Sequence, residues 1–370
     1  MSLSYLEVSV ARLVANVRAM GSLLSPDTRL IAVVKGNAYG HGLEQVVPAL
    51  EPHVDGFQVD DIEELRALRK LTTARALVLG YVGLADIEEA VTLNAELAIY
   101  DLARLQAISA VATKAGRNAR LHLKIDAALG RQGVLPTDVG EIAAAIAGLD
   151  GLELVSAYAH FANIEDTTDL GHAQLQLELL ERTVAALRLA GWPNLEIHSS
   201  ATSGVMTIES GSSLARVGLG LYGLYPSAAL ARQDSEAQLL PVLRWVSHLA
   251  QVKVLPPRHP VGYGLTFITP REMRIGIVPQ GYADGYDRGL SNSGEVLVAG
   301  KRCAVIGRVA MNMFAIDLTP VPDAKAEDEV VLLGSQGDEE ITSEELALRL
   351  GTINYEITTR ISPLLPRVVV

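Results

Sequence analysis

The chain has 370 residues, of which 49% are hydrophobic and 20% charged, with a formal net charge of −12 and a single cysteine. This length suits two domains, or one large barrel with an appendage. The acidic balance excludes a nucleic-acid binder, which needs a basic face. The lone Cys303 excludes a disulfide framework and fits a reducing cytoplasm.

The sequence predicts neither a membrane span nor a secretory signal. The longest uncharged run, residues 217–231, covers fifteen residues and is interrupted by three Gly and one Pro. It is too short and too broken to cross a bilayer. The N-terminus has no basic segment followed by an apolar block. We therefore expect a cytoplasmic globular protein without membrane or nucleic-acid partners.

From about residue 9 to residue 230, short β-branched runs alternate with longer amphipathic patterns. The expected strands are Leu30–Val34, Gly56–Val59, Ala76–Leu79, Leu97–Tyr100, Leu121–Ile125, Leu154–Ala159, Leu195–His198 and Leu214–Leu219. The expected helices include Asp61–Lys70, Asp86–Leu93, Asp101–Ala115, Thr137–Ala147 and Gly171–Ala190, and the first residue of each of the first four is a candidate N-cap.

Eight strands alternating with helices over about 220 residues are typical of an α/β fold of the (β/α)8 TIM-barrel type. An open doubly wound sheet is the competing architecture. That fold normally carries a GxGxxG turn after its first strand, and the segment GNAYGHG, residues 36–42, does not match it. The barrel is therefore the favoured interpretation.

The pattern changes near residue 231. The later segments are short, rich in β-formers and separated by Gly, Pro or Asp: Arg244–Val254, Met273–Val278, Glu295–Val298, Arg302–Val309, Phe314–Asp317 and Glu329–Leu333. No long helix intervenes before Thr342–Leu350. We predict a barrel domain at residues 10–230 and a mainly β domain at residues 231–370, joined by the polar bridge 231–238, with residues 1–9 able to pack as a strand with the second domain.

Residues just past the C-terminal ends of the barrel strands share one mouth, where active sites lie. These positions carry a cationic cluster capable of acid/base chemistry: Lys35, Asp126 through Arg131, His160, His198, Ser199, Thr202, Arg216, Gly218 and Leu219. Lys35 directly follows the buried run Ile31–Val34, so a rigid strand fixes its Cα as a Schiff-base lysine requires. The competing interpretations are a snorkelling lysine and a chance rim of solvated charges.

The loops after the seventh and eighth strands are the usual phosphate cradle of this fold. Here Ser199 and Thr202 offer hydroxyl groups, while Gly218 and Leu219 offer backbone N–H groups. The glycines could instead serve a tight strand–helix turn, which is the interpretation we prefer for Gly220 and Gly223. A lysine opposite a phosphate cradle is the arrangement that pyridoxal phosphate requires.

The motifs together resemble the alanine racemase family of fold type III pyridoxal-phosphate enzymes. The segment AVVKGNAYGHG, residues 32–42, is similar to the family's cofactor-attachment signature. The similarity continues in order through KIDAALGRQG, RVGLGLYGLYP, VGYGLTF, GYADGY, GRVAMNMFAIDL and INYEI. This resemblance implies a barrel plus a β domain, a head-to-tail homodimer with shared active sites, a D-alanine-forming isomerase activity and no metal.

The resemblance implies two bases, one for each face of the substrate Cα. Lys35 serves one face, and Tyr263 of the partner subunit serves the other. A phenol is a poor base unless cations stabilise its anion, and the family pattern puts His160 against Tyr263 with Arg216 beyond it. An arginine facing the cofactor's ring nitrogen can only donate a hydrogen bond, so that nitrogen stays unprotonated and side reactions such as transamination are disfavoured.

The remaining roles also follow from the resemblance. Arg131 matches the family's carboxylate-binding arginine and Lys124 its supporting lysine, which is carbamylated in some members. An unmodified Lys124 beside Arg131 would repel it, so we predict a carbamate; otherwise Lys124 simply points to solvent. The further matched positions are the phosphate tyrosines Tyr39 and Tyr355, the substrate-binding Met311, and Tyr282, Arg288 and Arg308 around the entrance.

Four positions depart from the family pattern. Glu165 stands where Asp is usual, Gln132 where an aliphatic residue is usual, and Ala310 and Asn312 replace a Cys and an Asp beside Met311. None removes a catalytic group, but the last two predict a broader specificity that includes serine. A fold type III decarboxylase, which Arg216 disfavours, and a lyase, which would need a divalent-metal ligand set that the sequence does not show, form a competing class. A non-enzymatic pyridoxal-phosphate carrier is a third class, and it would lack the β domain.

Overall fold

A computed structural model of the chain describes residues 3–165, 167–208, 211–232 and 238–370. They group into two compact units. The barrel unit comprises Leu13–Lys35 and Val46–Leu240, and the β unit comprises Met1–Arg12, Gly36–Gln45 and Pro241–Val370. Residues 36–45, which follow the predicted Schiff-base lysine, thus group with the β unit. Most of the predicted polar bridge, residues 233–237, lies outside the described residues.

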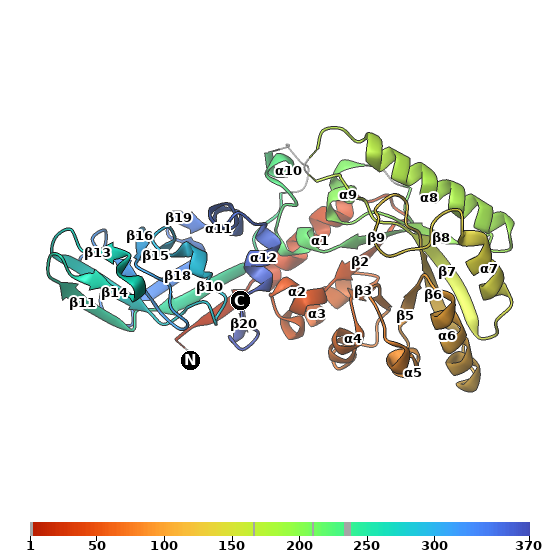
Figure 1. The fold of residues 1–370 in the computed structure, drawn as a ribbon, viewed down its shortest axis with the longest axis horizontal. Coiled ribbons are helices and arrows are strands. Elements are labelled where there is room, and N and C mark those ends of the chain that lie inside the picture. The colour runs from red at the N-terminus through yellow and green to blue at the C-terminus, as the bar shows by residue number, and fades with distance from the viewer. Residues whose placement is uncertain (1–2, 166, 209–210, 233–237) are drawn as a thin grey trace. The chain divides into compact units, whose positions relative to one another are not determined.

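Eight parallel strands form the sheet of the barrel unit, in the order β8-β7-β6-β5-β4-β3-β2-β9 (Figure 1). Their bounds are β2 (Arg29–Val33), β3 (Gly56–Val59), β4 (Ala76–Val78), β5 (Glu96–Ile99), β6 (Ala119–Lys124), β7 (Leu152–Tyr158), β8 (Glu196–His198) and β9 (Leu214–Val217). The Ser213 N–H donates to the Ile197 carbonyl at 2.7 Å and joins the two ends of the sheet. The predicted barrel is confirmed, and each predicted strand lies within two residues of an observed one.

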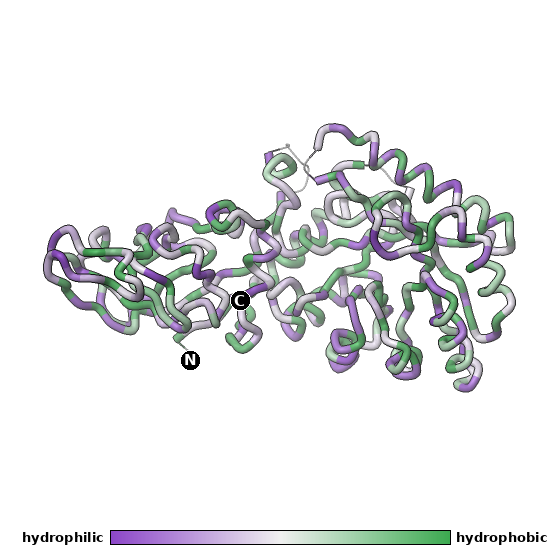
Figure 2. The backbone as a smooth tube through the Cα atoms, in the orientation of Figure 1, coloured by the Kyte–Doolittle hydropathy of each residue, from purple (hydrophilic) through white to green (hydrophobic). Residues whose placement is uncertain are grey.

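The helices lie around the outside of these strands (Figure 1). Those of six or more residues are α1 (Val10–Ser22), α3 (Leu43–Leu50), α4 (Ile62–Arg69), α5 (Ile87–Thr92), α6 (Leu102–Lys114), α7 (Val139–Ala147), α8 (Gly171–Leu189) and α9 (Thr202–Thr207). Along α8, hydrophilic and hydrophobic residues alternate, as one buried face requires (Figure 2).

Two of the four predicted helix caps are confirmed. Asp61 accepts a hydrogen bond from the Glu64 N–H, and Asp101 accepts one from the Arg104 N–H. Asp86 stands at the N-cap position of α5, but its side chain makes no capping hydrogen bond, and the prediction for Thr137 is wrong. A short 3-10 turn already ends at Asp86, and α7 begins two residues after Thr137, whose hydroxyl donates to the neighbouring Asp138 carboxylate instead.

The β unit contains a ten-stranded sheet in the order β11-β14-β17-β16-β15-β18-β10-β1-β20, with β19 paired to β18. The bounds are β1 (Tyr5–Val8), β10 (Leu243–His248), β11 (Gln251–Leu255), β14 (Met273–Val278), β15 (Glu295–Val298), β16 (Lys301–Ile306), β17 (Phe314–Asp317), β18 (Glu329–Gln336), β19 (Glu339–Ile341) and β20 (Arg367–Val369). A separate pair, β12 (Pro260–Val261) and β13 (Phe267–Ile268), and the helices α11 (Ser343–Leu350) and α12 (Asn354–Thr359) complete it.

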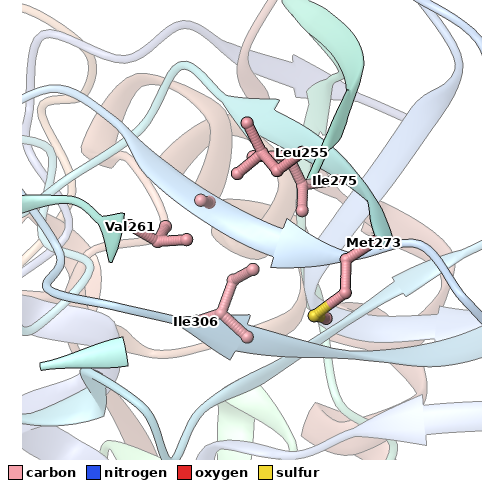
Figure 3. Packing of buried hydrophobic residues seen from close by; sticks show 6 residues of the cluster. Leu255, Val261, Met273, Ile275 and Ile306 are labelled. Atoms are coloured by element: carbon pink, nitrogen blue, oxygen red, sulfur yellow. The ribbon is translucent and has the colours of Figure 1, made fainter. Parts of the chain in front are cut away.

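One predicted strand of this unit is wrong. The segment 244–254 is two strands, because β10 pairs with β18 whereas β11 pairs with β14. The core beneath β11 and β14 contains Leu255, Val261, Met273, Ile275 and Ile306, which pack together in Figure 3. Among the helices of the described ranges, none has the length and apolar character needed to cross a bilayer.

Candidate active site

Lys35 stands at the mouth of the barrel, two residues after the end of β2. The strand is hydrogen-bonded on both sides, to β3 and β9, and the Val34 N–H donates to the Gln58 carbonyl at 2.9 Å. The Lys35 side chain is 43% exposed, and its Nζ lies 3.2 Å from Oδ1 of Asp60. The rigid strand thus delivers a reachable amine to the mouth. Asp60 was not predicted as a site residue, although it directly follows β3 and strand-end position was the signal used for the other mouth residues.

The chain turns left-handed immediately after Lys35. Gly36, Asn37, Ala38 and Tyr39 have φ between 52° and 62°, although the segment is formally the short helix α2 (Lys35–Tyr39). Left-handed helical turns cost L-residues about 1–2 kcal/mol each, and strain of this kind persists where function depends on it. The sequence offered only one hint, the density of glycine in residues 36–42.

Two side chains within the β unit hold this left-handed turn. His41 is fully buried, and its Nδ1 lies 3.1 Å from the carbonyl oxygens of both Ala38 and Tyr39. Burial lowers the pKa of His41 to about 4, so its ring is neutral at pH 7. Arg367 of β20 donates from Nε and Nη2 to the Gly40 carbonyl at 3.0 and 2.8 Å. These contacts offset the strain of the turn.

The turn brings together two tyrosines that the family resemblance assigns to one phosphate. Tyr39 lies in the turn and Tyr355 in α12, both in the β unit. Their ring centroids are 6.4 Å apart, with the rings tilted by 42°. Two phenols at this spacing can contact one small anion.

Arg216 of β9 links the ends of the neighbouring strands. Its Nη2 donates to the carbonyl oxygens of Ala159 and Ser199 at 3.2 and 3.4 Å, and it lies 3.5 Å from Nδ1 of His160. Burial lowers the pKa of Arg216 to about 10, so the guanidinium remains charged at pH 7. Burial and the Arg216 charge lower the pKa of His160 well below its ordinary value. The pair is therefore a fixed cation beside a neutral imidazole.

The residues of the predicted phosphate cradle lie at the ends of β8 and β9. Thr202 Oγ1 accepts hydrogen bonds from the N–H groups of Gly218 and Gly220, each at 3.2 Å. Both lone pairs of this hydroxyl are thereby used, and its hydrogen remains to be donated. Ser199 lies alongside, with its Oγ 3.3 Å from that of Ser212, and Leu219 begins a short 3-10 turn after Gly218.

The expectation that Gly220 and Gly223 serve the turn is confirmed. Gly223 caps this turn with a φ of 76°, a left-handed conformation that favours glycine. A Cβ on Gly220 would lie 2.7 Å from the Met20 sulfur. Packing and backbone conformation therefore explain both glycines.

Lys124, the last residue of β6, is 5% exposed. The interpretation that it points to solvent is therefore wrong. Its Nζ lies 4.5 Å from the centre of the Tyr158 ring. Burial, followed by the charges of Arg216 and Arg131, lowers the pKa of Lys124 to about 7. A large fraction of this amine is thus neutral at physiological pH.

The loop after Lys124 is compact and carries Arg131. The Asp126 carboxylate accepts hydrogen bonds from the N–H groups of Leu129 and Gly130, both at 2.9 Å. Arg131, His160 and Glu165 line one cavity of about 250 Å³, where Glu165 accepts a hydrogen bond from Ser203 at 3.2 Å. Gln132 faces away toward Tyr100, with a contact of 3.5 Å to its hydroxyl.

The β unit gathers five further predicted positions in a second cavity of about 670 Å³. Its apolar floor includes Leu255, Ile275 and Ile306 of the core in Figure 3. Its remaining lining includes the predicted residues Tyr263, Tyr282, Arg288, Arg308 and Met311, together with the departures Ala310 and Asn312. The predicted site residues thus form a cationic cluster in the barrel unit and an aromatic and methionine-lined cavity in the β unit.

These features define a (β/α)8-barrel protein with buried basic side chains at its mouth and a separate β unit. The family descriptions "Alanine racemase, N-terminal domain" and "Alanine racemase, C-terminal domain" match residues 8–226 and 242–369. The chain is 37% identical to an alanine racemase of Symbiobacterium thermophilum over 98% of this chain and 96% of the relative. It is 35% identical to the alanine racemase of Desulfosudis oleivorans, over 99% and 96%.

Solved structures agree with these relatives. The alanine racemase from D-cycloserine-producing Streptomyces lavendulae superposes with a TM-score of 0.93 and 34% identity, over 100% of this chain and 97% of that one. The alanine racemase of Bacillus anthracis with bound L-Ala-P gives a TM-score of 0.94 and 30% identity, over 100% and 95%. The chain belongs to the alanine racemase family.

The close packing of the left-handed turn predicts that an alanine substitution costs more stability at Gly40 than at Gly116, although both glycines have positive φ. A Cβ on Gly40 would lie 2.0 Å from the Thr358 carbonyl oxygen, whereas a Cβ on Gly116 would meet nothing within 4 Å. Gly116→Ala should cost only the backbone strain, about 1 kcal/mol. Gly40→Ala should lower the free energy of unfolding by about 3 kcal/mol or more, measured by urea denaturation. Equal losses would contradict the close packing of the turn.

Proposed function

We propose that the chain is a pyridoxal-phosphate-dependent alanine racemase that acts as a homodimer, with Lys35 and Tyr263 as the two bases. One observation carries the proposal: an accessible amine, Lys35, stands at a barrel mouth where the buried guanidinium of Arg216 is charged and Lys124 contributes a second buried amine. Relatives that match nearly the whole chain are named alanine racemase, which supports alanine as the substrate.

The residues at the mouth fit pyridoxal phosphate. The Lys35 amine can bond to its aldehyde, and the hydroxyl hydrogen of Thr202, whose oxygen already accepts from Gly218 and Gly220, can donate to its phosphate. Burial, followed by the charges of Arg216 and Arg131, lowers the pKa of Lys124, and these two nearby arginine charges would stabilise a bound anion. When bound, the cofactor would supply an electron sink for the charge left at Cα when a proton is removed.

The proton movements can be assigned to atoms of this chain. Nζ of Lys35 would take or return a proton on one face of Cα, and the Tyr263 hydroxyl would do so on the other. Arg131, exposed at the edge of the mouth cavity, would hold the substrate carboxylate, because a guanidinium binds carboxylates with two parallel hydrogen bonds. Arg216 stays charged, so it can donate a hydrogen bond to the ring nitrogen but cannot protonate it.

The exposure of the β-unit cavity supports a shared site. Tyr263 is 74% exposed, Leu265 63%, Met311 54% and Met313 53%. A cluster of large exposed apolar side chains marks an interaction surface, and aromatic residues and Met are enriched at interfaces. A second copy of the chain would bury this surface and bring Tyr263 to a barrel mouth. We also infer a cytoplasmic location, which the single buried Cys303 supports.

The environment of Lys124 supports the carbamate. Carbamylation joins the amine nitrogen to the carbon of CO₂ with loss of an amine proton, and it requires the neutral amine. Burial beside Arg216 and Arg131 provides that neutral form by lowering the pKa to about 7. The modification would replace a buried cation by an anion that attracts both arginines.

The two-base assignment predicts an asymmetric defect in Tyr263→Phe. Racemisation of alanine should fall by about 100-fold or more, the usual contribution of a positioned acid or base. In D₂O, Lys35 should still exchange the α-hydrogen of the one enantiomer whose Cα–H faces it, with retention of configuration. Chiral chromatography measures the racemisation, and proton NMR measures the exchange of the α-hydrogen. Tyr81→Phe, a change at an exposed barrel tyrosine (57%), is the control and should behave as wild type. Unchanged racemisation in Tyr263→Phe, or exchange lost for both enantiomers, contradicts the assignment.

The carbamate predicts a ¹³C NMR signal from protein equilibrated with ¹³C-bicarbonate. The signal should be absent in Lys124→Ala, and KM for alanine should rise in that variant because Arg131 loses its anionic neighbour. Lys114→Ala is the matched control, since Lys114 is an exposed lysine paired with Glu88. A wild-type spectrum without a Lys124-dependent signal would rule the carbamate out.

A further inference from the structure

Five polar side chains cross the interior of the barrel and form a continuous hydrogen-bond network. They come from five adjacent positions around the ring and are at most 4% exposed: Glu96 of β5, His122 of β6, Ser156 of β7, His198 of β8 and Arg216 of β9. We refer to this set as the barrel network. Its Arg216 end is part of the candidate site, whereas the remaining four residues have no role in the proposed mechanism.

The contacts of the barrel network are continuous. Nη1 of Arg216 contacts Nδ1 of His198. Nε2 of His198 lies 3.1 Å from both Nδ1 of His122 and the Ser156 hydroxyl, which in turn contacts that same His122 nitrogen. Nε2 of His122 lies 2.7 Å from Oε2 of Glu96. The Tyr158 ring stacks on His198 with 4.7 Å between centroids and 3° between planes, which fixes the ring orientation.

Chemistry allows only one direction for the protons in this network. Arginine has donors only, so Nδ1 of His198 must accept and its proton must sit on Nε2. That N–H then donates to Ser156 or His122. At the far end the Glu96 carboxylate can only accept, so Nδ1 of a neutral His122 carries no proton and accepts from His198 or from the Ser156 hydroxyl. The proton of His122 is consequently on Nε2, where it donates to the Glu96 carboxylate. Every donor in the network points from Arg216 toward Glu96.

The residues at the two ends of the barrel network cannot exchange their donor and acceptor roles. Burial works against the charge of Glu96, but hydrogen bonds from His122 and Arg75 outweigh it and hold its pKa at about 2, so it remains an acceptor. Arg75 donates to Oε2 from Nε and Nη2 at 2.9 and 2.8 Å, and Arg120 pairs with Oε1. Burial lowers the pKa of both His122 and His198, so each ring is neutral and carries a single proton. A carboxylate at one end and a guanidinium at the other leave one self-consistent arrangement.

We propose that Glu96, His122, Ser156 and His198 are positioning residues that fix the direction in which Arg216 donates its hydrogen bonds. Nδ1 of His198 holds Nη1, and this anchors the guanidinium while Nη2 remains directed at the mouth toward His160. If the network reversed, an imidazole N–H would face a guanidinium N–H and push Arg216 out of place. That the network would orient Arg216 toward the cofactor's ring nitrogen rests on the proposed function. The direction of the hydrogen bonds in the network does not.

The direct test is ¹⁵N NMR of the cofactor-loaded protein labelled at its histidines, with the His122 and His198 signals assigned by substitution. The proposal expects an unprotonated Nδ1 and a protonated Nε2 in both residues. A proton on Nδ1 of His198 in the wild-type protein would overturn it. This readout needs no catalytic turnover, so the network can be confirmed even if the protein fails to racemise alanine, in which case only the proposed function is refuted.

Two substitutions separate positioning from mere packing. His122→Gln can still donate to Glu96 and accept from Ser156, so it should preserve the His198 pattern and most of kcat. His122→Leu can do neither, so it should allow a proton on Nδ1 of His198 and lower kcat by about tenfold or more, the loss expected for one hydrogen bond to a charged group, with KM little changed. Identical His198 spectra and kcat in the two variants would overturn the proposal.

Discussion

The structure depends on holding positive charge out of water at the mouth of the barrel. Arg216 and Lys124 are almost fully buried, and desolvation of a charge is expensive unless hydrogen bonds or an opposite charge offset it. The protein meets this cost in two ways. Arg216 keeps its charge because strand-end carbonyl groups and His198 accept its hydrogen bonds, whereas Lys124 has a pKa near 7 and is partly neutral. Both arrangements prepare the mouth for anionic groups.

A second cost, backbone strain, is concentrated beside Lys35. Four consecutive left-handed residues follow it; buried His41 contacts the carbonyl groups of Ala38 and Tyr39, and Arg367 donates to that of Gly40. Backbone strain is thus found in the β unit and buried charge in the barrel unit. A site that binds an anionic cofactor and moves protons needs both, because proton transfer depends on fixed positions and on stabilised charge.

The sequence predicted the architecture because hydrophobic periodicity and strand-end position are local properties. All eight barrel strands and the mouth residues Lys35, His160 and Arg216 followed from them. The barrel network could not be predicted, because His122 reads as an ordinary strand residue and Glu96 lies one residue before the predicted strand Leu97–Tyr100. Only the closed ring brings β5, β6 and β8 together. The left-handed turn was hidden for a different reason: Asn37, Ala38 and Tyr39 have positive φ against their intrinsic preference, and tertiary contacts maintain it. The side chain of Asp86 makes no capping hydrogen bond and a 3-10 turn ends at that residue, while Thr137 lies one residue before the observed N-cap of α7.

The central claim is that Lys35 of one chain works with Tyr263 of another, and a hybrid dimer tests it most directly. Lys35→Ala and Tyr263→Phe chains carrying different affinity tags would be co-expressed, and the hybrid isolated through both tags. In a two-fold symmetric dimer with shared sites, one site receives both defects and the second receives neither, so the hybrid should have about half the wild-type racemase activity. If both bases came from the same chain, every site would carry a defect, and the hybrid would be no more active than the parent variants.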